Sequence, residues 1–552
     1  MEETSADYII VGGGLTGCAL ATRLAQRLDS SVSILILEAG PDPTSNPNTT
    51  TPMEGLKLQG SELDWAYPTA PTPSTANRVY NLTSGKTLGG GSILNYGGWA
   101  RGNAGDYDAW AQITGDERWG YRGLLPYMKR SEQFSAKEAT ADQNGLDGPL
   151  KITGVSASDP MRRYPLREPL KKAWEEVGVQ LVAGNGCSGS LAGISEFLET
   201  WDGGVRQPSH LAYGLAKTRV NIRTNTLVDR VLFERLSGKP PRANGVLLAD
   251  GIRIKANREV LLAAGALRSP QILQLSGVGP ADMLSQHAIP LVHDSPSVGV
   301  NLFDHFAFFQ IFKLRNPKRG LALGHPALSN PAFLKGFPVD WSINEAVPAQ
   351  QLQQALADDG DSLDREGLGN PGRTHVESLV MYHPYIPGLP VDGSLVATSV
   401  MLTNPTSRGS VGLASASPND LPVIEPNYFS TSVDHAALVH GSRRLLRALT
   451  YTTSGQEFFE GEMAPAPGLD PLSLNSSDDE ITERIRMVGS PHYHPAGTCA
   501  LGSVIDTNLK VKGVHGLRVI DASIFPAPLS GHPQATLYGV AELAAEIIAG
   551  RE

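Results

Sequence analysis

A glycine-rich turn near the start of the chain constrains the fold more than any other feature. Residues 7–11 form an apolar run that is too short for a helix and is typical of a buried strand. The turn Gly-Gly-Gly-Leu-Thr-Gly follows at residues 12–17, and leucines at every fourth position over residues 20–28 then give one apolar helix stripe. A second apolar run, residues 32–37, ends on Glu38. This order predicts a strand–turn–helix–strand unit.

The glycines and the acid of this unit match the requirements of a dinucleotide. Gly12 permits a tight turn, Gly14 lets the backbone approach a pyrophosphate, and Gly17 lets the helix pack closely on the strand. The free N–H groups at the start of the helix would face the phosphates. Glu38 lies 21 residues beyond Gly17, where its carboxylate can accept hydrogen bonds from the adenosine ribose. The unit predicts dinucleotide binding and leaves FAD and NAD open.

Length, net charge and cysteine content argue against several other classes of protein. At 552 residues the chain is longer than one ordinary core, so at least two domains are expected. The net charge of −10 argues against nucleic acid and anionic membranes as partners, and no apolar run reaches the roughly 18 residues of a membrane span. The three cysteines show neither metal-ligand spacing nor a disulfide framework. A first strand near residue 7 leaves no room for a signal peptide, so we expect a cytoplasmic protein, or a secreted one if the chain was trimmed.

Residues 85–102 carry the second informative motif. Seven glycines among these eighteen residues are too many for a stable helix or strand, and they would let the backbone lie against a flat or anionic ligand. By composition alone the segment could also be a flexible loop. The string Gly-Lys-x-Leu-Gly-Gly-x-Ser-x-x-Asn, followed by an aromatic residue and Arg-Gly, closely resembles the first signature of the glucose–methanol–choline (GMC) oxidoreductase family. Residues 265–279 fit the second signature of that family.

The resemblance implies a fold class and a domain plan. It implies an α/β protein with an antiparallel sheet, in which a Rossmann-like FAD-binding domain joins a discontinuous substrate-binding domain, as in aryl-alcohol oxidase-like and choline dehydrogenase-like members. The FAD-binding domain is expected over residues 1–45, 76–110, 205–305 and 490–552. An excursion or lid is expected over residues 46–75, and a substrate-binding cap over residues 111–204 and 306–489.

The same resemblance assigns the cofactor site. In this family the loop at residues 85–102 wraps the flavin, and some members link FAD covalently through a histidine at the position of Asn95, so non-covalent FAD is expected here. Trp65, the one bulky residue of the excursion, could serve packing alone or contact the cofactor. The residues assigned to FAD are Gly12, Gly14, Leu15, Thr16, Gly17, Glu38, Ala39, Trp65, Leu88, Gly91, Asn95, Tyr96, Gly97, Gly98, Val228, Asp521, Ala522, Pro533 and Gln534.

Two histidines, His494 and His532, are the candidate catalytic residues. Taken alone, either could be a structural histidine. Together with His492 they could bind zinc, but no cysteine or carboxylate clusters with them in the sequence, so no metal is expected. In the resembling family the base that takes the hydroxyl proton of an alcohol falls on His494, and its hydrogen-bonding partner falls on His532. Neutral imidazole suits the first task, and a hydrogen-bond donor that stabilises the alkoxide suits the second.

The implied reaction is oxidation of a primary or secondary alcohol to the carbonyl by hydride transfer to flavin N5. The implied partners are a small-molecule alcohol and oxygen or another electron acceptor. Tyr96 and Tyr493 flank the motifs, and aromatic walls would favour a conjugated alcohol, although both could simply pack against the flavin. A non-redox lyase on the same scaffold and a flavin-binding protein without catalysis remain as alternatives.

Local patterns predict four further elements. Short strands with Pro/Gly turns over residues 306–489 suit an antiparallel sheet. Residues 265–279 predict a strand, a turn and a helix with Pro270 in its first turn and Gly277 as its stop. Ser477 predicts a capping box that opens a helix. Residues 351–373, rich in acids and glycines, predict an exposed loop.

Overall fold

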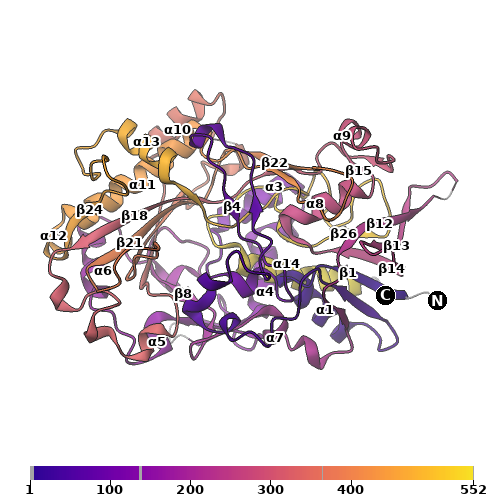
Figure 1. Cartoon of the computed structure of the whole chain (residues 1–552), viewed down its shortest axis with the longest axis horizontal. Helices are drawn as coiled ribbons and strands as arrows, with labels where there is room; N and C mark the ends of the chain where they lie inside the picture. Colours follow the sequence, from indigo (N-terminus) through magenta and orange to yellow (C-terminus); the bar gives the residue numbers. More distant parts are fainter. Residues whose placement is uncertain (1–4, 136–139, 236, 364, 551–552) are drawn as a thin grey trace.

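The computed structural model of the chain describes residues 5–135, 140–235, 237–363 and 365–550. Five of the predicted domain segments therefore lie partly outside the described residues: 1–45, 111–204, 205–305, 306–489 and 490–552. Two seven-stranded sheets lie toward opposite ends of an elongated molecule (Figure 1). The first is mainly parallel and the second antiparallel, which confirms the predicted fold class. None of the helices in the described ranges is long and apolar enough to cross a membrane.

The first sheet carries the glycine-rich turn. Its strands are, in spatial order, β11 (Asn221–Arg223), β2 (Ile34–Leu37), β1 (Ser5–Val11), β14 (Arg253–Leu262), β13 (Arg242–Leu248) and β12 (Val228–Glu234), with β26 (Leu517–Val519) paired to the end of β14. Ile9 and Ile10 point to opposite faces of β1 and are both fully buried, which is why this strand is a continuous apolar run. Because β2, β1, β14 and β26 run parallel, the loops that follow them lie at one edge of the sheet.

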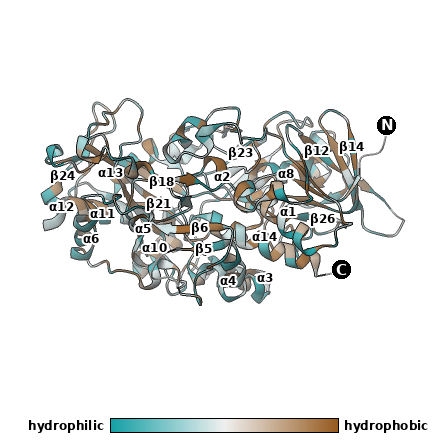
Figure 2. Cartoon of the chain, turned by 90° about the horizontal axis from the view of Figure 1, so that it is seen from below, coloured by the Kyte–Doolittle hydropathy of each residue, from teal (hydrophilic) through white to brown (hydrophobic). Residues whose placement is uncertain are grey.

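The helices at this sheet come from both ends of the chain. Helix α1 (Leu15–Arg27) packs against α14 (Pro533–Ala549), which in turn packs against α4 (Tyr121–Ser131). Both termini of the described chain therefore lie at the same end of the molecule (Figure 2). Apolar residues of the segment 111–204, among them Ile152 and Leu198, belong to the same core, so its packing extends past residue 110, where the cap was expected to begin. The domain limits stay a prediction.

The second sheet is antiparallel, as residues 306–489 predict. Its strands are, in spatial order, β24 (Phe459–Met463), β18 (Phe306–Leu314), β21 (Leu395–Leu402), β20 (Val376–Met381), β19 (Trp341–Glu345) and β7 (Gly193–Glu196). Strand β7 comes from residues 111–204, so both segments expected to form the cap contribute to one sheet.

Three central strands of this sheet present two rows of side chains to an interior cavity. The first row is Phe309, Ser399 and Leu379, and the second row is Ile311, Ala397 and Met381. Neighbouring residues point to the other face, because side chains alternate along a strand. There Phe308 and Val380 share an apolar core with residues of α11 (Ser432–Thr450). The sheet thus separates a packed side from a cavity side.

The prediction for Pro270 is wrong. Helix α8 (Gly265–Leu275) begins almost directly after β14, so Pro270 lies in the helix interior rather than in its first turn. An interior proline deprives the carbonyl four residues earlier of its N–H partner. Here that carbonyl, of Ala266, accepts a hydrogen bond of 2.6 Å from Thr498 Oγ1 instead. Gly277 has φ +81° just after the helix and stops it, as predicted.

Of the other local predictions, one is partly wrong and one is confirmed. The exposed loop expected over residues 351–373 is partly wrong, because α10 (Ala349–Asp358) buries Leu352 and Leu356. The capping box is confirmed, because Ser477 and Glu480 exchange hydrogen bonds at the start of α13 (Asp478–Val488). The glycine-rich residues 85–102 contain one short helix, α2 (Gly91–Leu94), and are otherwise mostly irregular.

Candidate active site

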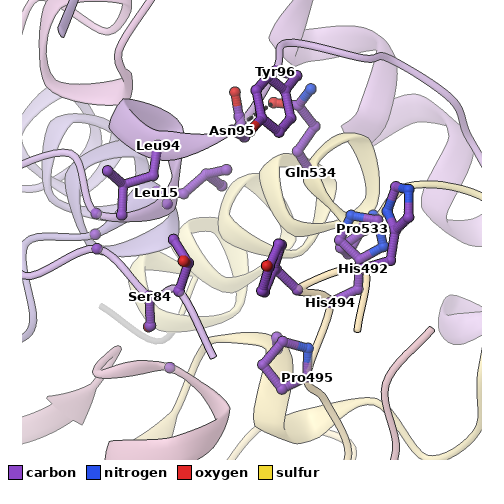
Figure 3. A pocket seen from close by; sticks show the side chains of 18 of the residues that line it. Leu15, Ser84, Leu94, Asn95, Tyr96, His492, His494, Pro495, Pro533 and Gln534 are labelled. Carbon is purple, nitrogen blue, oxygen red and sulfur yellow. Dashed lines mark hydrogen bonds between the residues drawn. The ribbon is translucent and has the colours of Figure 1, made fainter. Parts of the chain in front are cut away.

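One cavity of about 630 Å³ extends between the two sheets. Its first part is lined by the loops that follow β1, β2, β14 and β26, and its second part by side chains of β18, β20 and β21. Figure 3 shows Leu15 of α1 on one side of the cavity and His494 on the other. Strand β25 (Ser490–Pro491) pairs with β18 and so brings residues 492–494 to the junction of the two parts.

The first part of the cavity needs its glycines. A Cβ on Gly12 would collide with the Ala263 carbonyl, and a Cβ on Gly17 would collide with the Gly12 carbonyl. A Cβ on Gly14, in contrast, would have no atom nearer than 3.9 Å, so this side of the turn is open. Helix α1 starts at Leu15 with no side-chain cap and no acid in its first turn, which leaves its N–H groups for an anion.

A second glycine loop faces the first. A Cβ on Gly90 would lie 2.7 Å from the Gly14 Cα atom, whereas a Cβ on Gly91 would meet nothing within 4 Å. Any side chain at Gly90 would therefore close the gap between the two loops. Open backbone, an uncapped helix N-terminus and a buried acid at the end of β2 together fit the pyrophosphate and ribose of FAD.

Glu38 has a second task that the sequence did not predict. Its two carboxylate oxygens accept the N–H groups of Gly13 at 2.8 Å and Gly40 at 2.9 Å. The side chain is buried, and this burial raises its pKa. An ionised carboxylate offers about four acceptor positions, so acceptor capacity remains for a ribose hydroxyl. The acid thus holds the glycine turn and lines the cavity at once.

Glu38→Gln is expected to weaken FAD binding by about 1–2 kcal/mol, because charge-assisted hydrogen bonds are lost. This corresponds to a Kd increase of roughly 5- to 30-fold, measurable by titrating apoprotein with FAD. Asp42→Asn removes an exposed acid near the same loop and should leave the affinity unchanged. Unchanged affinity in Glu38→Gln would restrict the acid to holding the turn.

Asn95 ties the glycine-rich loop to the start of α14. Its amide donates to Gln534 Oε1 at 3.2 Å and accepts from the Gly97 N–H and from Arg206, both at 3.0 Å (Figure 3). Arg206 is buried without an acidic partner among the described residues, and burial lowers its pKa to about 9. Helix α14 begins with no side-chain cap, so its first N–H groups also remain for a ligand.

All residues assigned to FAD line the cavity except Gly17 and Leu88. Gly17 lies under the turn, where close packing excludes a side chain. Leu88 is buried behind the turn, and a Cβ on Gly13 would lie 2.8 Å from its Cδ1 atom, so Leu88 supports the loop and does not face the cavity. Trp65 stacks on Tyr67 with ring centroids 5.6 Å apart and also lines the cavity, so it packs as one account expected, and its contact with the cofactor stays a prediction.

A hydrogen bond from the backbone of His494 to a buried carboxylate fixes the position of this residue. Its N–H donates to Asp304 Oδ1 at 2.6 Å, and the Tyr428 hydroxyl donates to the other oxygen at 2.6 Å. Tyr493, directly before it, has φ +63°, which is rare for a bulky residue and costs conformational energy. The buried acceptor stabilises this turn and so sets the direction of the His494 side chain.

His305 selects the tautomer of His494. The two Nδ1 atoms are 3.0 Å apart, and His305 also hydrogen-bonds the backbone of Leu529. A carbonyl only accepts, so His305 carries its proton on Nε2 and its Nδ1 accepts from His494 Nδ1–H. His494 Nε2 therefore keeps its lone pair. Burial, together with nearby His492, His305 and His532, lowers the pKa of His494 well below its usual value, so the ring is neutral.

The pKa of His532 is shifted in the opposite direction. Its ring centroid lies 5.1 Å from that of His494, and its Nε2 lies 3.0 Å from Glu377 Oε1. Burial opposes the imidazolium, but the charge of Glu377 and this hydrogen bond together raise the pKa of His532 above its usual value. The second oxygen of Glu377 accepts from Ser342 Oγ at 3.0 Å. The site thus pairs a ring whose neutral form is favoured, His494, with a ring whose protonated form is stabilised by Glu377, His532.

Sequence reasoning missed three residues of this site. Glu377 is a lone acid in the otherwise uncharged run of β20, and that isolation was its only signal. Asp304 and His305 end a segment, residues 297–305, that resembles the GMC family, but no motif assigned them a task. All three act through partners that are distant in sequence.

The second part of the cavity is aromatic and uncharged. Phe337 lies between Tyr96 and Tyr385, with ring centroids 5.4 Å apart in each pair; it is tilted against Tyr96 and stacked on Tyr385. Tyr96 and Tyr493 both line the cavity, as the sequence suggested. Among the described lining residues, the only Asp, Glu, Lys or Arg side chains are Glu38, Arg268 and Asp521, and all belong to the first part.

Comparison with known proteins shows which family the chain belongs to. The N-terminal GMC oxidoreductase family model matches residues 6–307 and the C-terminal one matches residues 405–541. The GMC-type oxidoreductase acuG of Aspergillus aculeatus is 39% identical over 98% of both chains, and the oxygen-dependent choline dehydrogenase of Cronobacter sakazakii is 35% identical over 99% of this chain and 95% of its own. A solved structure of Aspergillus oryzae formate oxidase is 28% identical, with a TM-score of 0.86 over 100% of this chain and 99% of its own. The chain belongs to the GMC oxidoreductase family, a family of FAD-dependent flavoproteins.

Proposed function

We propose that the protein is an FAD-dependent oxidase or dehydrogenase that converts a primary or secondary alcohol to the carbonyl. The observation that carries the proposal is the pair His494 and His532, with ring centroids 5.1 Å apart where the two parts of the cavity meet. Bound FAD would supply the hydride acceptor. His494 Nε2 takes the hydroxyl proton as the hydride leaves the carbinol carbon, and His532 donates a hydrogen bond to the oxygen on which charge builds.

The substrate is proposed to be a neutral, aromatic or conjugated alcohol. A charged substrate buried in the second part of the cavity would lose its hydration without meeting an Asp, Glu, Lys or Arg side chain among the described lining residues. A flat ring can instead stack on Tyr96, Phe337 or Tyr385, where offset stacking adds to the area buried.

Anaerobic mixing with a panel of alcohols tests this function. Neutral aromatic alcohols should bleach the flavin absorbance fastest and yield one carbonyl per flavin, ahead of aliphatic alcohols, sugars, choline and formate. Product without bleaching would point to the lyase, and neither product nor bleaching to a binding protein. Admitting oxygen afterwards, and then an artificial acceptor, separates an oxidase from a dehydrogenase.

FAD is proposed to be bound without a covalent link. The Asn95 amide lacks the nucleophilic ring nitrogen that a histidine would offer, and it is engaged by Gln534, Gly97 and Arg206. Acid precipitation should therefore release all flavin into the supernatant, measured by absorbance. Flavin that stays with the precipitated chain would contradict this.

A further inference from the structure

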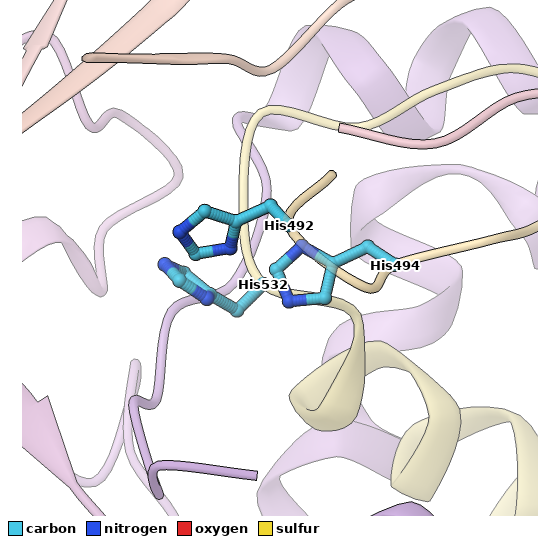
Figure 4. Close-up of side chains that lie close together, drawn as sticks. All are labelled: His492, His494 and His532. Carbon is cyan, nitrogen blue, oxygen red and sulfur yellow. The ribbon is translucent and has the colours of Figure 1, made fainter. Parts of the chain in front are cut away.

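Three histidines at the cavity junction lie close enough to share a ligand. One ring nitrogen from each of His492, His494 and His532 can be chosen so that all three lie within 4.8 Å of one another (Figure 4). Tetrahedral zinc with Zn–N bonds of about 2.0–2.1 Å needs ligand nitrogens roughly 3.4 Å apart, so ring rotations that bring the nitrogens closer by up to roughly 1.4 Å would suffice. All three side chains line the cavity, which gives an ion access.

Two of these rings already have one nitrogen engaged by a neighbouring side chain, which leaves the other nitrogen for an ion. Metal-bound histidines usually give their other ring nitrogen to a carboxylate or another acceptor, which fixes the tautomer and the ring orientation. His532 Nε2 contacts Glu377 Oε1 at 3.0 Å, and His494 Nδ1 contacts His305 Nδ1 at 3.0 Å. In the sequence no carboxylate lies near these histidines, whereas the fold brings Glu377 to them from 155 residues away.

We propose that His492, His494 and His532 form a reversible binding site for a transition-metal dication, zinc or copper, whose occupation inhibits the enzyme. The ion displaces to solvent any proton on the His532 nitrogen that does not contact Glu377. Three protein nitrogens then leave one position of a tetrahedron for water or a substrate hydroxyl. Imidazole favours zinc and copper over magnesium and calcium, and copper should bind more tightly than zinc. The inhibition rests on the proposed function, because an ion on His494 Nε2 occupies the lone pair that must accept the hydroxyl proton.

Zinc chloride titrated into the purified holoenzyme tests the site directly. Equilibrium dialysis in neutral, chelator-free buffer, followed by metal analysis, should give one zinc per chain that EDTA removes, and magnesium chloride should give none. His492→Gln should weaken zinc binding at least about tenfold. His515→Gln changes an exposed histidine elsewhere and should bind zinc like the parent. Flavin absorbance and thermal unfolding report whether both variants are folded.

Activity measured on the same samples separates the two proposals. Zinc is expected to inhibit competitively with the alcohol and to be reversed by EDTA. Equal zinc binding to the parent and to His492→Gln, or stoichiometric binding to neither, would overturn the metal site. Zinc that binds the parent, is lost in His492→Gln and leaves turnover untouched would keep the metal site and remove His494 from its place as the base.

Discussion

His494→Ala is expected to slow reduction of the bound flavin by an alcohol about 10²–10⁴-fold, because the variant lacks the ring that we propose accepts the hydroxyl proton. Anaerobic stopped-flow measurement of flavin absorbance gives this rate directly. An alcohol deuterated at the carbinol carbon should show a primary isotope effect on the same step. His532→Asn should be milder, because an amide still donates a hydrogen bond to the oxygen.

His515→Ala, a change at an exposed position, provides the control and should reduce its flavin at the parent rate. A His494→Ala variant that binds FAD and reduces it at nearly the parent rate would transfer the task of base to another histidine of the cavity. His492 would be the first to examine, since its ring lies 5.0 Å from that of His494.

The pH profile should report the environment of His494. The groups that face it are His305, His492, His532 and the buried Asp304. Burial first, and then the neighbouring histidines, lower the pKa of His494 well below 6.5. The ring therefore stays neutral as pH falls through the range in which an exposed histidine takes up a proton. Flavin reduction should lose its rate only below that range, in contrast to the profile of an ordinary imidazole base.

Glu377→Gln is expected to slow flavin reduction on the order of 10²-fold near neutral pH, comparable to removing one donor that stabilises a developing oxyanion. Without the carboxylate charge, burial dominates and lowers the pKa of His532, so the ring loses its extra proton at lower pH. The alkaline limb of the rate profile should move to lower pH in the variant. A reduced rate with an unshifted alkaline limb would mean that Glu377 only packs.

The same pair should leave a signature in stability. The pKa of His532 is raised on folding, so its contribution is complete below the unfolded value of about 6.5 and is lost as pH rises through the folded value. Burial works to raise the pKa of Glu377, but His532 leaves it lowered, so its contribution is complete above about 4.5 and is lost as pH falls through the folded value. The difference in unfolding free energy between parent and Glu377→Gln should peak between about pH 4.5 and 6.5.

The nucleotide half of the site could be predicted because its determinants are local. The glycine turn between a strand and a helix, and the acid at the end of the next strand, all lie within the first 38 residues, so their relative positions follow from the local sequence. His494 and His532 likewise lie in short strings with a clear resemblance. The capping box at Ser477 succeeded for the same reason, because both of its hydrogen bonds span three residues.

The errors have one cause, which is that a distant partner decides the outcome. From the local sequence, Pro270 predicts the start of a helix. It is tolerated in the helix interior because Thr498 donates a hydrogen bond to the Ala266 carbonyl, which loses its helical partner to the proline. Residues 351–358 are mostly polar, and the sequence does not show that their few apolar side chains pack into the core of the second sheet. Glu377 is one acid in a strand until the fold sets it against His532. No local period or propensity carries such information.

The two cavity rows on β18, β20 and β21 make this protein an economical starting point for altering substrate scope. The six side chains lie in two registered triplets on one face, while the alternate residues of the same strands pack with α11 on the other. A combinatorial library confined to Phe309, Ser399, Leu379, Ile311, Ala397 and Met381 would reshape the cavity near His494 and His532. It would leave the glycine loops and the sheet's packed side unchanged, so variants should keep their flavin and differ in the alcohols that they accept.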